Sequence, residues 1–418
     1  MAPAVHVVGA GLAGLGCAVA LAQAGRRVLV HDAAGQAGGR CRSYHDEALD
    51  RRIDNGNHLM LSGNQAVHAY LAAIGMEDGL TGPDRAEYPF LDLESGERWT
   101  LRPSAGVIPW WIWNPSRRIP GTRAADYLRG LRLARAGADV TVRHCLDAEG
   151  PGFRRFWEPL AVAVLNTSAD DGAAALLWPV MRQTFGRGER ASRPRLARDG
   201  LGPCFVDPAV AWLRERDCDV AFNRRVRGIE FDGRAAALRF SDGTVALGEG
   251  EGVVLAVPPG VASDLVPGLV APERSNAIVN GHFRMPAPAA EVSLMGLVGG
   301  TSQWIFVRGD VASVTVSAAD DLADLPAEEI ARIMWPEVVA ALGLGDRSLP
   351  PHRIVKERRA TFAQTPDQVA MRPETRTEWQ NLWLAGDWTD TGLPATIEGA
   401  LQSGHAAAAA VLAKPLNT

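Results

Sequence analysis

The stretch Val7-Val8-Gly9-Ala10-Gly11-Leu12-Ala13-Gly14 decides the fold of this chain. The apolar residues that lead into it are too few for a helix and suit a buried parallel strand. Gly9 then allows a tight turn, Gly11 lets a phosphate approach the backbone, and Gly14 lets the following helix pack closely on the strand. We expect that helix at about residues 12–23, with its first N–H groups directed at a diphosphate.

The residues after this helix indicate a dinucleotide site. Gly25 ends the helix, residues 27–31 predict a second strand, and Asp32 stands at the end of that strand. A carboxylate there accepts hydrogen bonds from both ribose hydroxyls and repels a 2′-phosphate, which disfavours NADP. The predicted cofactor contacts in this half of the site are Gly9, Gly11, Leu12, Ala13, Gly14 and Asp32.

Two further motifs distinguish FAD from NAD. Gly38-Gly39-Arg40 lets the backbone pass beneath the phosphates and brings a guanidinium to them. Near the other end, Leu384-Ala385-Gly386-Asp387 precedes a helix that begins at Ile397. The positive N-terminus of that helix suits the negative charge that builds on a reduced flavin. Together these motifs resemble the extended signature of the amine oxidase and carotenoid desaturase flavoprotein superfamily.

The resemblance implies a role for each matching position. The further cofactor contacts that it implies are Gly38, Gly39, Arg40, Asn57, His58, Val226, Gly386, Asp387, Thr396 and Ile397. Among these, Asp387 would accept a hydrogen bond from the ribityl chain, and the backbone of Val226 would meet adenine. The segment around Asn57 and His58 would lie against the flavin ring. No cysteine lies between residues 388 and 398, so we expect the FAD to be bound non-covalently.

Composition limits the classes of function. The net charge of −5 over 418 residues gives no reason to expect nucleic acid as a partner. The five cysteines lack metal-ligand or disulfide spacing, which predicts no metal site and suits a reducing compartment. We see no signal peptide, and the most apolar window, residues 253–272, contains Asp264 and several prolines. We therefore expect a cytoplasmic protein without a membrane span.

The positions of the FAD motifs predict the domain organisation. The expected fold class is α/β, a Rossmann-like FAD-binding domain of the amine oxidase and glutathione reductase type with an inserted α+β substrate-binding domain. Residues 1–65, about 200–265 and about 350–418 would form the FAD-binding domain. Residues 66–199 and 266–349 would then form the substrate-binding domain.

The segment 109–135 combines tryptophan and arginine. Residues 109–115 hold three tryptophans, and three arginines follow by residue 123. A predicted helix has an apolar face and a basic face, formed by Tyr127, Leu128, Leu131 and Ala134 and by Arg129, Arg132 and Arg135. A basic, tryptophan-flanked amphipathic unit favours peripheral contact with the cytoplasmic face of a membrane. A core helix with a solvated arginine face is the more common alternative, and both interpretations stay open.

Internal segments carry a more selective resemblance than the glycine motifs. Asp54-Asn55-Gly56-Asn57-His58-Leu59-Met60-Leu61 and Leu165-Asn166-Thr167-Ser168 resemble segments of the squalene-associated FAD-dependent desaturases, also called hydroxysqualene dehydroxylases, of hopanoid biosynthesis. Residues 278–284, 303–306 and 313–317 look like further blocks of that family. The resemblance implies that reduced flavin delivers hydride to a C30 allylic alcohol, hydroxysqualene, which loses its hydroxyl and becomes squalene. No second glycine motif suggests NAD(P)H, so the electron donor stays unknown.

This reaction needs a proton donor beside the flavin in a long apolar site. His58 is the first candidate, because imidazolium donates a proton near neutral pH; a structural histidine is the alternative. Asp54 is the second candidate, although a carboxylate before a glycine turn more often caps that turn. Asn166 and Thr167 would orient the hydroxyl or cap a helix. Glu398 is expected to bond backbone rather than take part in chemistry.

Three other functions compete with this hypothesis. An isoprenoid desaturase would use the same pocket with hydride moving to FAD, and the sequence does not fix that direction. An amine oxidase has less support, because that group places an aromatic ring where this chain has Thr396. A non-catalytic isoprenoid carrier would keep FAD as a structural group that resists reduction.

Overall fold

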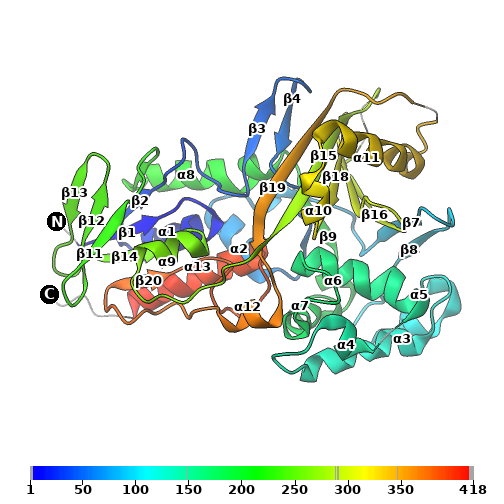
Figure 1. The fold of residues 1–418 in the computed structure, drawn as a ribbon, viewed down its shortest axis with the longest axis horizontal. Helices are drawn as coiled ribbons and strands as arrows, with labels where there is room; N and C mark the ends of the chain where they lie inside the picture. Colours follow the sequence, from blue (N-terminus) through cyan, green and yellow to red (C-terminus); the bar gives the residue numbers. More distant parts are fainter. Residues whose placement is uncertain (1–2, 148, 288, 290, 346, 414–418) are drawn as a thin grey trace.

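The computed structural model describes residues 3–147, 149–287, 289, 291–345 and 347–413. The molecule is elongated, and two lobes follow one another along its long axis (Figure 1). The N-terminal strand and the C-terminal helix lie in the same lobe, so both ends of the chain contribute to it.

The first lobe is built on a five-stranded parallel sheet with the order β10-β2-β1-β14-β20. The strand bounds are β1 Ala4–Val8, β2 Arg27–His31, β10 Asp219–Ala221, β14 Gly252–Leu255 and β20 Leu382–Leu384. Most of their side chains are buried, because a parallel sheet is covered on both faces. The predicted strands at the two FAD motifs, β1 and β20, therefore lie in one sheet, with β14 between them.

Helices α1 (Leu12–Gln23) and α13 (Ile397–Leu412) pack against each other beside this sheet. Glycines at the crossing allow the close approach: a Cβ on Gly404 would lie 2.3 Å from the Ala13 carbonyl oxygen, and one on Gly16 would lie 3.0 Å from Leu401. Both helices begin where the sequence predicted. Helix α8 (Asp207–Arg214) and the antiparallel sheet of β11 (Gly228–Phe231), β12 (Ala235–Phe240) and β13 (Gly243–Ala246) complete this part of the lobe.

The second lobe contains a seven-stranded mixed sheet with the order β19-β15-β18-β17-β16-β7-β8. Its bounds are β7 Tyr88–Asp92, β8 Arg98–Leu101, β15 Ser275–Arg284, β16 Ser293–Val298, β17 Trp304–Arg308, β18 Val311–Val316 and β19 His352–Phe362. Helix α11 (Ala327–Leu342) buries its apolar face against this sheet. A layer of short helices lies on the other side, namely α3 Ala124–Leu128, α4 Val142–Leu146, α5 Gly150–Gly152, α6 Glu158–Leu165 and α7 Leu177–Gln183.

Two predicted domain boundaries need correction. Strand β19 lies after residue 350, yet it pairs with β15 in the substrate-lobe sheet from Ser275 to Phe283. Helix α2 (Gln65–Ala73) lies after residue 65, yet its buried side chains Val67, Tyr70 and Leu71 join the core of the FAD lobe. The apolar pattern of each segment is compatible with either lobe, so the sequence alone did not assign them.

The helix predicted at 127–134 is also different in detail. Helix α3 ends at Leu128 and a tighter 3₁₀ segment continues over Arg129–Arg135. As a consequence Tyr127 and Leu133 are buried, whereas Leu128 and Leu131 point to solvent. Within the described ranges, no helix is long and apolar enough to cross a bilayer.

Candidate flavin and substrate site

The glycine motifs come together as an open cradle at the start of α1. A Cβ placed on Gly11 would meet no atom within 4 Å, and one on Gly39 would meet only the Gly11 Cα at 3.5 Å. Gly11 also pairs with Gly38 in an isolated bridge. Helix α1 begins directly after Gly11 without a side-chain cap, so its first N–H groups remain available. Open space and free N–H donors fit an anionic diphosphate.

Gly9 and Gly14 are required for close packing of the backbone. A Cβ on Gly14 would lie 1.9 Å from the Gly9 carbonyl oxygen. Gly9 has a φ of +107°, and its Cβ would lie 2.3 Å from the Ala256 carbonyl oxygen. These two glycines therefore allow α1 and β14 to approach β1, as the motif predicts.

Asp32 is held rigidly at the end of β2. Its carboxylate accepts hydrogen bonds from the backbone N–H of Ala10 at 2.6 Å and of Ala34 at 2.7 Å. The Arg224 N–H donates to the Asp32 carbonyl at 2.7 Å, which brings the segment that contains Val226 alongside. Val226 itself is buried. The predicted ribose and adenine contacts thus lie in one region.

Arg40 and Asp387 join the two halves of the site. Arg40 Nη2 donates to Asp387 Oδ1 at 2.7 Å, and Arg40 Nη1 donates to the Ala360 carbonyl at 2.5 Å. The carboxylate of Asp387 raises the pKa of the Arg40 guanidinium. The sequence motifs predicted that Arg40 contacts a phosphate and that Asp387 contacts the ribityl chain. In the structure these two side chains bond to each other next to β19.

The N-terminus of α13 is fixed by its own cap and by α2. Thr396 Oγ1 accepts a hydrogen bond from the Gly399 N–H at 3.1 Å. The Glu398 carboxylate accepts from the backbone N–H groups of Ala66 and Val67, each at 3.0 Å. Burial raises the pKa of Glu398. The expectation that Glu398 bonds backbone is confirmed.

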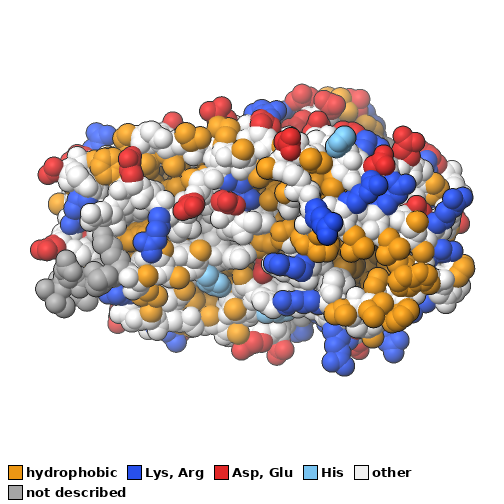
Figure 2. Space-filling view, turned by 90° about the horizontal axis from the view of Figure 1, so that it is seen from below, with side chains coloured by type: hydrophobic (Ala, Val, Ile, Leu, Met, Phe, Trp, Pro, Cys, Tyr) orange, Lys and Arg blue, Asp and Glu red, His pale blue; other side chains and the backbone are white. Residues whose placement is uncertain are grey.

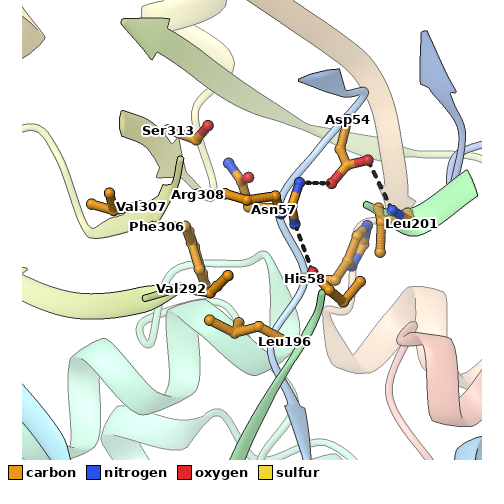
Figure 3. A pocket seen from close by; sticks show the side chains of 11 residues that line it. Asp54, Asn57, His58, Leu196, Leu201, Val292, Phe306, Val307, Arg308 and Ser313 are labelled. Atoms are coloured by element: carbon orange, nitrogen blue, oxygen red, sulfur yellow. Dashed lines mark hydrogen bonds and ion pairs between the residues drawn. The ribbon is translucent and has the colours of Figure 1, made fainter. Parts of the chain in front are cut away.

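A pocket opens between the His58 segment and the substrate-lobe sheet (Figure 3). Its lining residues are Asp54, Asn57, His58, Leu196, Ala197, Leu201, Val292, Phe306, Val307, Arg308 and Ser313. In Figure 3, Asp54 lies between Arg308 and Leu201, while Val292, Phe306 and Leu196 gather away from the carboxylate. The pocket therefore combines a polar wall with an apolar wall, as a largely hydrocarbon ligand with one polar group requires.

Asp54 is saturated with hydrogen-bond donors. Arg308 Nη1 donates to it at 2.9 Å, the Leu201 N–H at 2.9 Å and the Ser43 hydroxyl at 2.5 Å. Its side chain is 2% exposed. The two carboxylate oxygens of Asp54 are therefore occupied by donors from the protein itself. Asp54 is therefore better suited to fixing Arg308 than to donating a proton.

His58 lies within the pocket with its Nε2 4.0 Å from the Cys41 sulfur. Burial lowers the pKa of His58 to about 4, against a weaker opposite influence of Asp54. Burial likewise raises the pKa of the Cys41 thiol to about 12. Burial of His58 therefore favours the neutral imidazole near neutral pH and opposes the expected imidazolium.

Asn57 connects the flavin-side segment to the substrate-lobe sheet. Its Nδ2 donates to Thr315 Oγ1 at 3.0 Å, and that hydroxyl donates to Asn280 Oδ1 at 2.8 Å. Asn280 Nδ2 in turn reaches the Asn55 carbonyl at 3.4 Å. The network couples β15 and β18 to the predicted flavin contact.

Asn166 and Thr167 do not line the pocket. Asn166 ends α6 with a φ of +46°, and its Oδ1 accepts from the Ala318 N–H at 2.7 Å. Thr167 Oγ1 accepts from the Gln364 N–H at 3.0 Å, and Gln364 Oε1 accepts from the Ala395 N–H at 2.9 Å. These contacts hold the end of α6 against neighbouring loops, one of which leads to α13. They agree with the second role that the sequence offered for Asn166 and Thr167, the capping of a helix.

Arg308 is the pocket residue that the sequence did not reveal. It lies on β17, 254 positions from Asp54, and its Nη2 also donates to the Ala197 carbonyl at 3.0 Å. Ser313 begins the 313–317 block that resembles the family, but no site role was predicted for it; its hydroxyl lies 2.8 Å from Nδ1 of the buried His282. The sequence does not place either residue in the pocket, because only the strand order of the second lobe brings them to the His58 segment.

Comparison with known proteins agrees with this site. A family model described as flavin containing amine oxidoreductase matches residues 12–412. Among solved structures, putrescine oxidase bound to putrescine superimposes with a TM-score of 0.74 over 99% of this chain and 100% of that one, at 18% sequence identity. The fold and the glycine cradle therefore define an FAD-dependent oxidoreductase.

More similar relatives identify the family. A hydroxysqualene dehydroxylase of Rhodopseudomonas palustris is 46% identical over 99% of both chains. A hydroxysqualene dehydroxylase of Sinorhizobium fredii is 45% identical over 97% of both chains. A probable zeta-carotene desaturase of Synechococcus elongatus is 23% identical over 98% of both chains. The chain belongs to the hydroxysqualene dehydroxylase family of the flavin-containing amine oxidoreductases.

Proposed function

We propose that this protein reduces hydroxysqualene to squalene. The main support is the 46% identity to a hydroxysqualene dehydroxylase over 99% of both chains. The half-polar, half-apolar pocket beside the predicted flavin contact supports the same reaction. Bound FAD, once reduced, supplies the hydride that replaces the hydroxyl. The chain's own residues bind the cofactor, orient the alcohol, exclude water and deliver a proton.

The apolar wall holds the carbon chain and the polar wall holds the hydroxyl. Leu196, Val292 and Phe306 exclude water from the reacting carbon, which protects an allylic cation from capture. Arg308 and Asn57 lie on the polar side, where a guanidinium or an amide can hold the departing oxygen.

His58 is the proposed proton donor. With a pKa lowered to about 4 by burial, its imidazolium is a strong acid but is rare at neutral pH. A negative charge beside the ring raises an imidazole pKa. A bound, reduced cofactor would supply such a charge, and His58 would then hold the proton that the departing hydroxyl takes. Asp54 is proposed as a positioning residue, because its carboxylate is already engaged by Arg308, the Leu201 N–H and the Ser43 hydroxyl.

We infer also that FAD is held without a covalent bond. Four of the five cysteines are buried, and burial raises the pKa of the Cys41 thiol, which disfavours the nucleophilic thiolate. Acid precipitation of the purified protein should leave the yellow cofactor in the supernatant. A yellow pellet would contradict this inference.

An anaerobic half-reaction tests the function and its direction. The flavin is reduced with dithionite, excess reductant is removed, and hydroxysqualene is added while the flavin spectrum and the extracted lipids are followed. Reoxidation with stoichiometric squalene is the expected result. Bleaching of the oxidised enzyme by a saturated isoprenoid would favour a desaturase instead, in line with the more distant relatives. A flavin that dithionite does not reduce would indicate a carrier.

We propose further that a donor outside this chain supplies the electrons, and that the protein meets its C30 substrate at a membrane surface. The support for the second point is that the substrate is a hydrocarbon which partitions into bilayers. Tryptophans on the outside of the substrate lobe provide a means of contact.

A further inference from the structure

Exposed apolar side chains gather on one face of the substrate lobe. Nine large hydrophobic side chains are exposed within the described ranges, and six of them lie between residues 107 and 131. These six, which we call the docking face, are Val107, Ile108, Trp110, Trp113, Leu128 and Leu131. Figure 2 shows a broad hydrophobic area at one end of the molecule, bordered by basic side chains. A contiguous apolar area on a protein surface marks an interaction site.

The docking face is held in place by buried neighbours. Trp111 is 6% exposed and its ring packs edge-on against Tyr127 at 4.7 Å between centroids, and Ile112 is 1% exposed. In contrast, Trp110 is 63% and Trp113 is 50% exposed, with their rings 5.6 Å apart. The two outer tryptophans therefore project from a firmly packed segment rather than from a loose loop.

The surroundings of the docking face are strongly basic. Residues 102–135 contain seven arginines and one acidic residue, in a chain whose net charge is −5. The exposed arginines among them include Arg117, Arg123, Arg132 and Arg135. The single acidic residue, Asp126, is occupied in capping α3 through the Arg123 N–H. Arg102 pairs with Glu87, and Arg129 and Arg132 share Asp147. The arginines still outnumber these carboxylates, so the remaining positive charge complements an anionic surface.

We propose that the docking face inserts into anionic phospholipid bilayers, with the surrounding arginines on the headgroups. Tryptophan and leucine side chains enter the acyl boundary, and arginine side chains reach phosphate oxygens, as interfacial proteins require. A second copy of the chain is a poorer occupant. A symmetric dimer through this face would bring two sets of seven arginines together.

Vesicle flotation tests the proposal without any need for catalysis. Full-length protein with bound FAD should float with phosphatidylglycerol-containing vesicles and should bind phosphatidylcholine vesicles much more weakly. Trp110→Ala with Trp113→Ala should reduce binding at least tenfold, whereas the double Phe variant should retain most of it. An unchanged flavin absorbance ratio and circular dichroism spectrum verify that each variant is folded.

Arginine variants measure the electrostatic contribution to vesicle binding separately from the apolar contribution. Arg132→Ser and Arg135→Ser should each lower binding to anionic vesicles by about fivefold at low salt. Arg239→Ser, on β12 in the other lobe, is the matched control and should leave binding unchanged. Equal flotation of all variants and wild type would overturn the proposal. A stable dimer in solution, lost in the Trp110→Ala, Trp113→Ala protein, would overturn it in favour of self-association. Vesicle binding is measured without turnover. If the anaerobic half-reaction yielded no squalene, the proposed function would fail, but the vesicle experiment would still test membrane binding.

Discussion

Arg40 Nη2 lies 2.7 Å from Asp387 Oδ1, so one ion pair links two motifs that are 347 residues apart. The Arg40 side chain is 44% exposed and that of Asp387 is 8% exposed. The pair lies where the FAD lobe meets β19, because Arg40 also donates to the Ala360 carbonyl. Two predicted cofactor contacts therefore meet each other at the edge of the substrate-lobe sheet.

Two glycines of one motif should respond differently to the same change. Gly11→Ala is expected to fold normally but to lose most of its FAD, because the new Cβ meets no protein atom and occupies the diphosphate approach. Gly14→Ala is expected not to fold, because its Cβ would lie 1.9 Å from the Gly9 carbonyl oxygen. Circular dichroism and the 450-to-280 nm absorbance ratio distinguish these outcomes. If Gly11→Ala retained its full amount of FAD, Gly11 would not lie where the diphosphate binds.

Removal of the Asp387 carboxylate should weaken FAD retention. Asp387→Ala leaves Arg40 without its partner and removes the predicted ribityl acceptor. Asp387→Asn keeps an acceptor and should retain more cofactor. The measurement is FAD occupancy after gel filtration, with the protein's melting temperature as a check on folding. Equal FAD occupancy in the wild type and in Asp387→Ala would show that Asp387 does not contribute to FAD binding.

The sequence predicted the FAD lobe well for a local reason. A strand, a glycine turn and a helix follow one another directly over residues 4–23, so the glycines between Gly9 and Gly14 act on elements next to them in the chain. The same holds for the helix that begins at Ile397 and for its cap at Thr396.

The pocket was less predictable, because its partners meet only through tertiary structure. Asp54 and Arg308 are 254 residues apart, and neither neighbourhood contains a motif for the pair. Burial also changed the expected chemistry of His58, since the pKa of a histidine depends on surroundings that the local sequence does not describe. In the same way, the helix period alone did not show that Leu128 and Leu131 face solvent.

Substitution of Asp92 should lower the folding stability more than substitution of an exposed carboxylate does. It is fully buried, and its carboxylate accepts from Arg155 at 2.8 Å and Arg154 at 3.1 Å. Asp92→Ala removes the buried carboxylate between these arginines, which keep only the more exposed Glu94 and Glu97, and should lower stability by about 3 kcal/mol. Asp367→Ala, which breaks the exposed pair with Arg274, should cost less than about 1 kcal/mol. Chemical denaturation of both variants makes the comparison, and equal midpoints would contradict the assignment of Asp92.

Stability should fall as the pH is lowered from about 6.5 to about 4. Burial holds the pKa of His31, His58 and His282 at about 4, so the unfolded chain binds more protons than the folded one throughout this window. Each histidine then contributes a slope of about 1.4 kcal/mol per pH unit. Below the window both states are protonated and these histidines add no further slope.

The urea midpoint between pH 4.5 and 7 measures this effect, and His282→Gln should make the dependence shallower. His282 Nδ1 bonds the Ser313 hydroxyl, so the substitution also lowers stability at pH 7, and the slope rather than the absolute midpoint is the relevant quantity. His45, whose side chain is 60% exposed, provides the control. His45→Gln should leave the slope unchanged. A midpoint that does not vary between pH 5 and 7 would mean that these histidines are solvated in the folded protein, and the neutral state assigned to His58 would fall with that result.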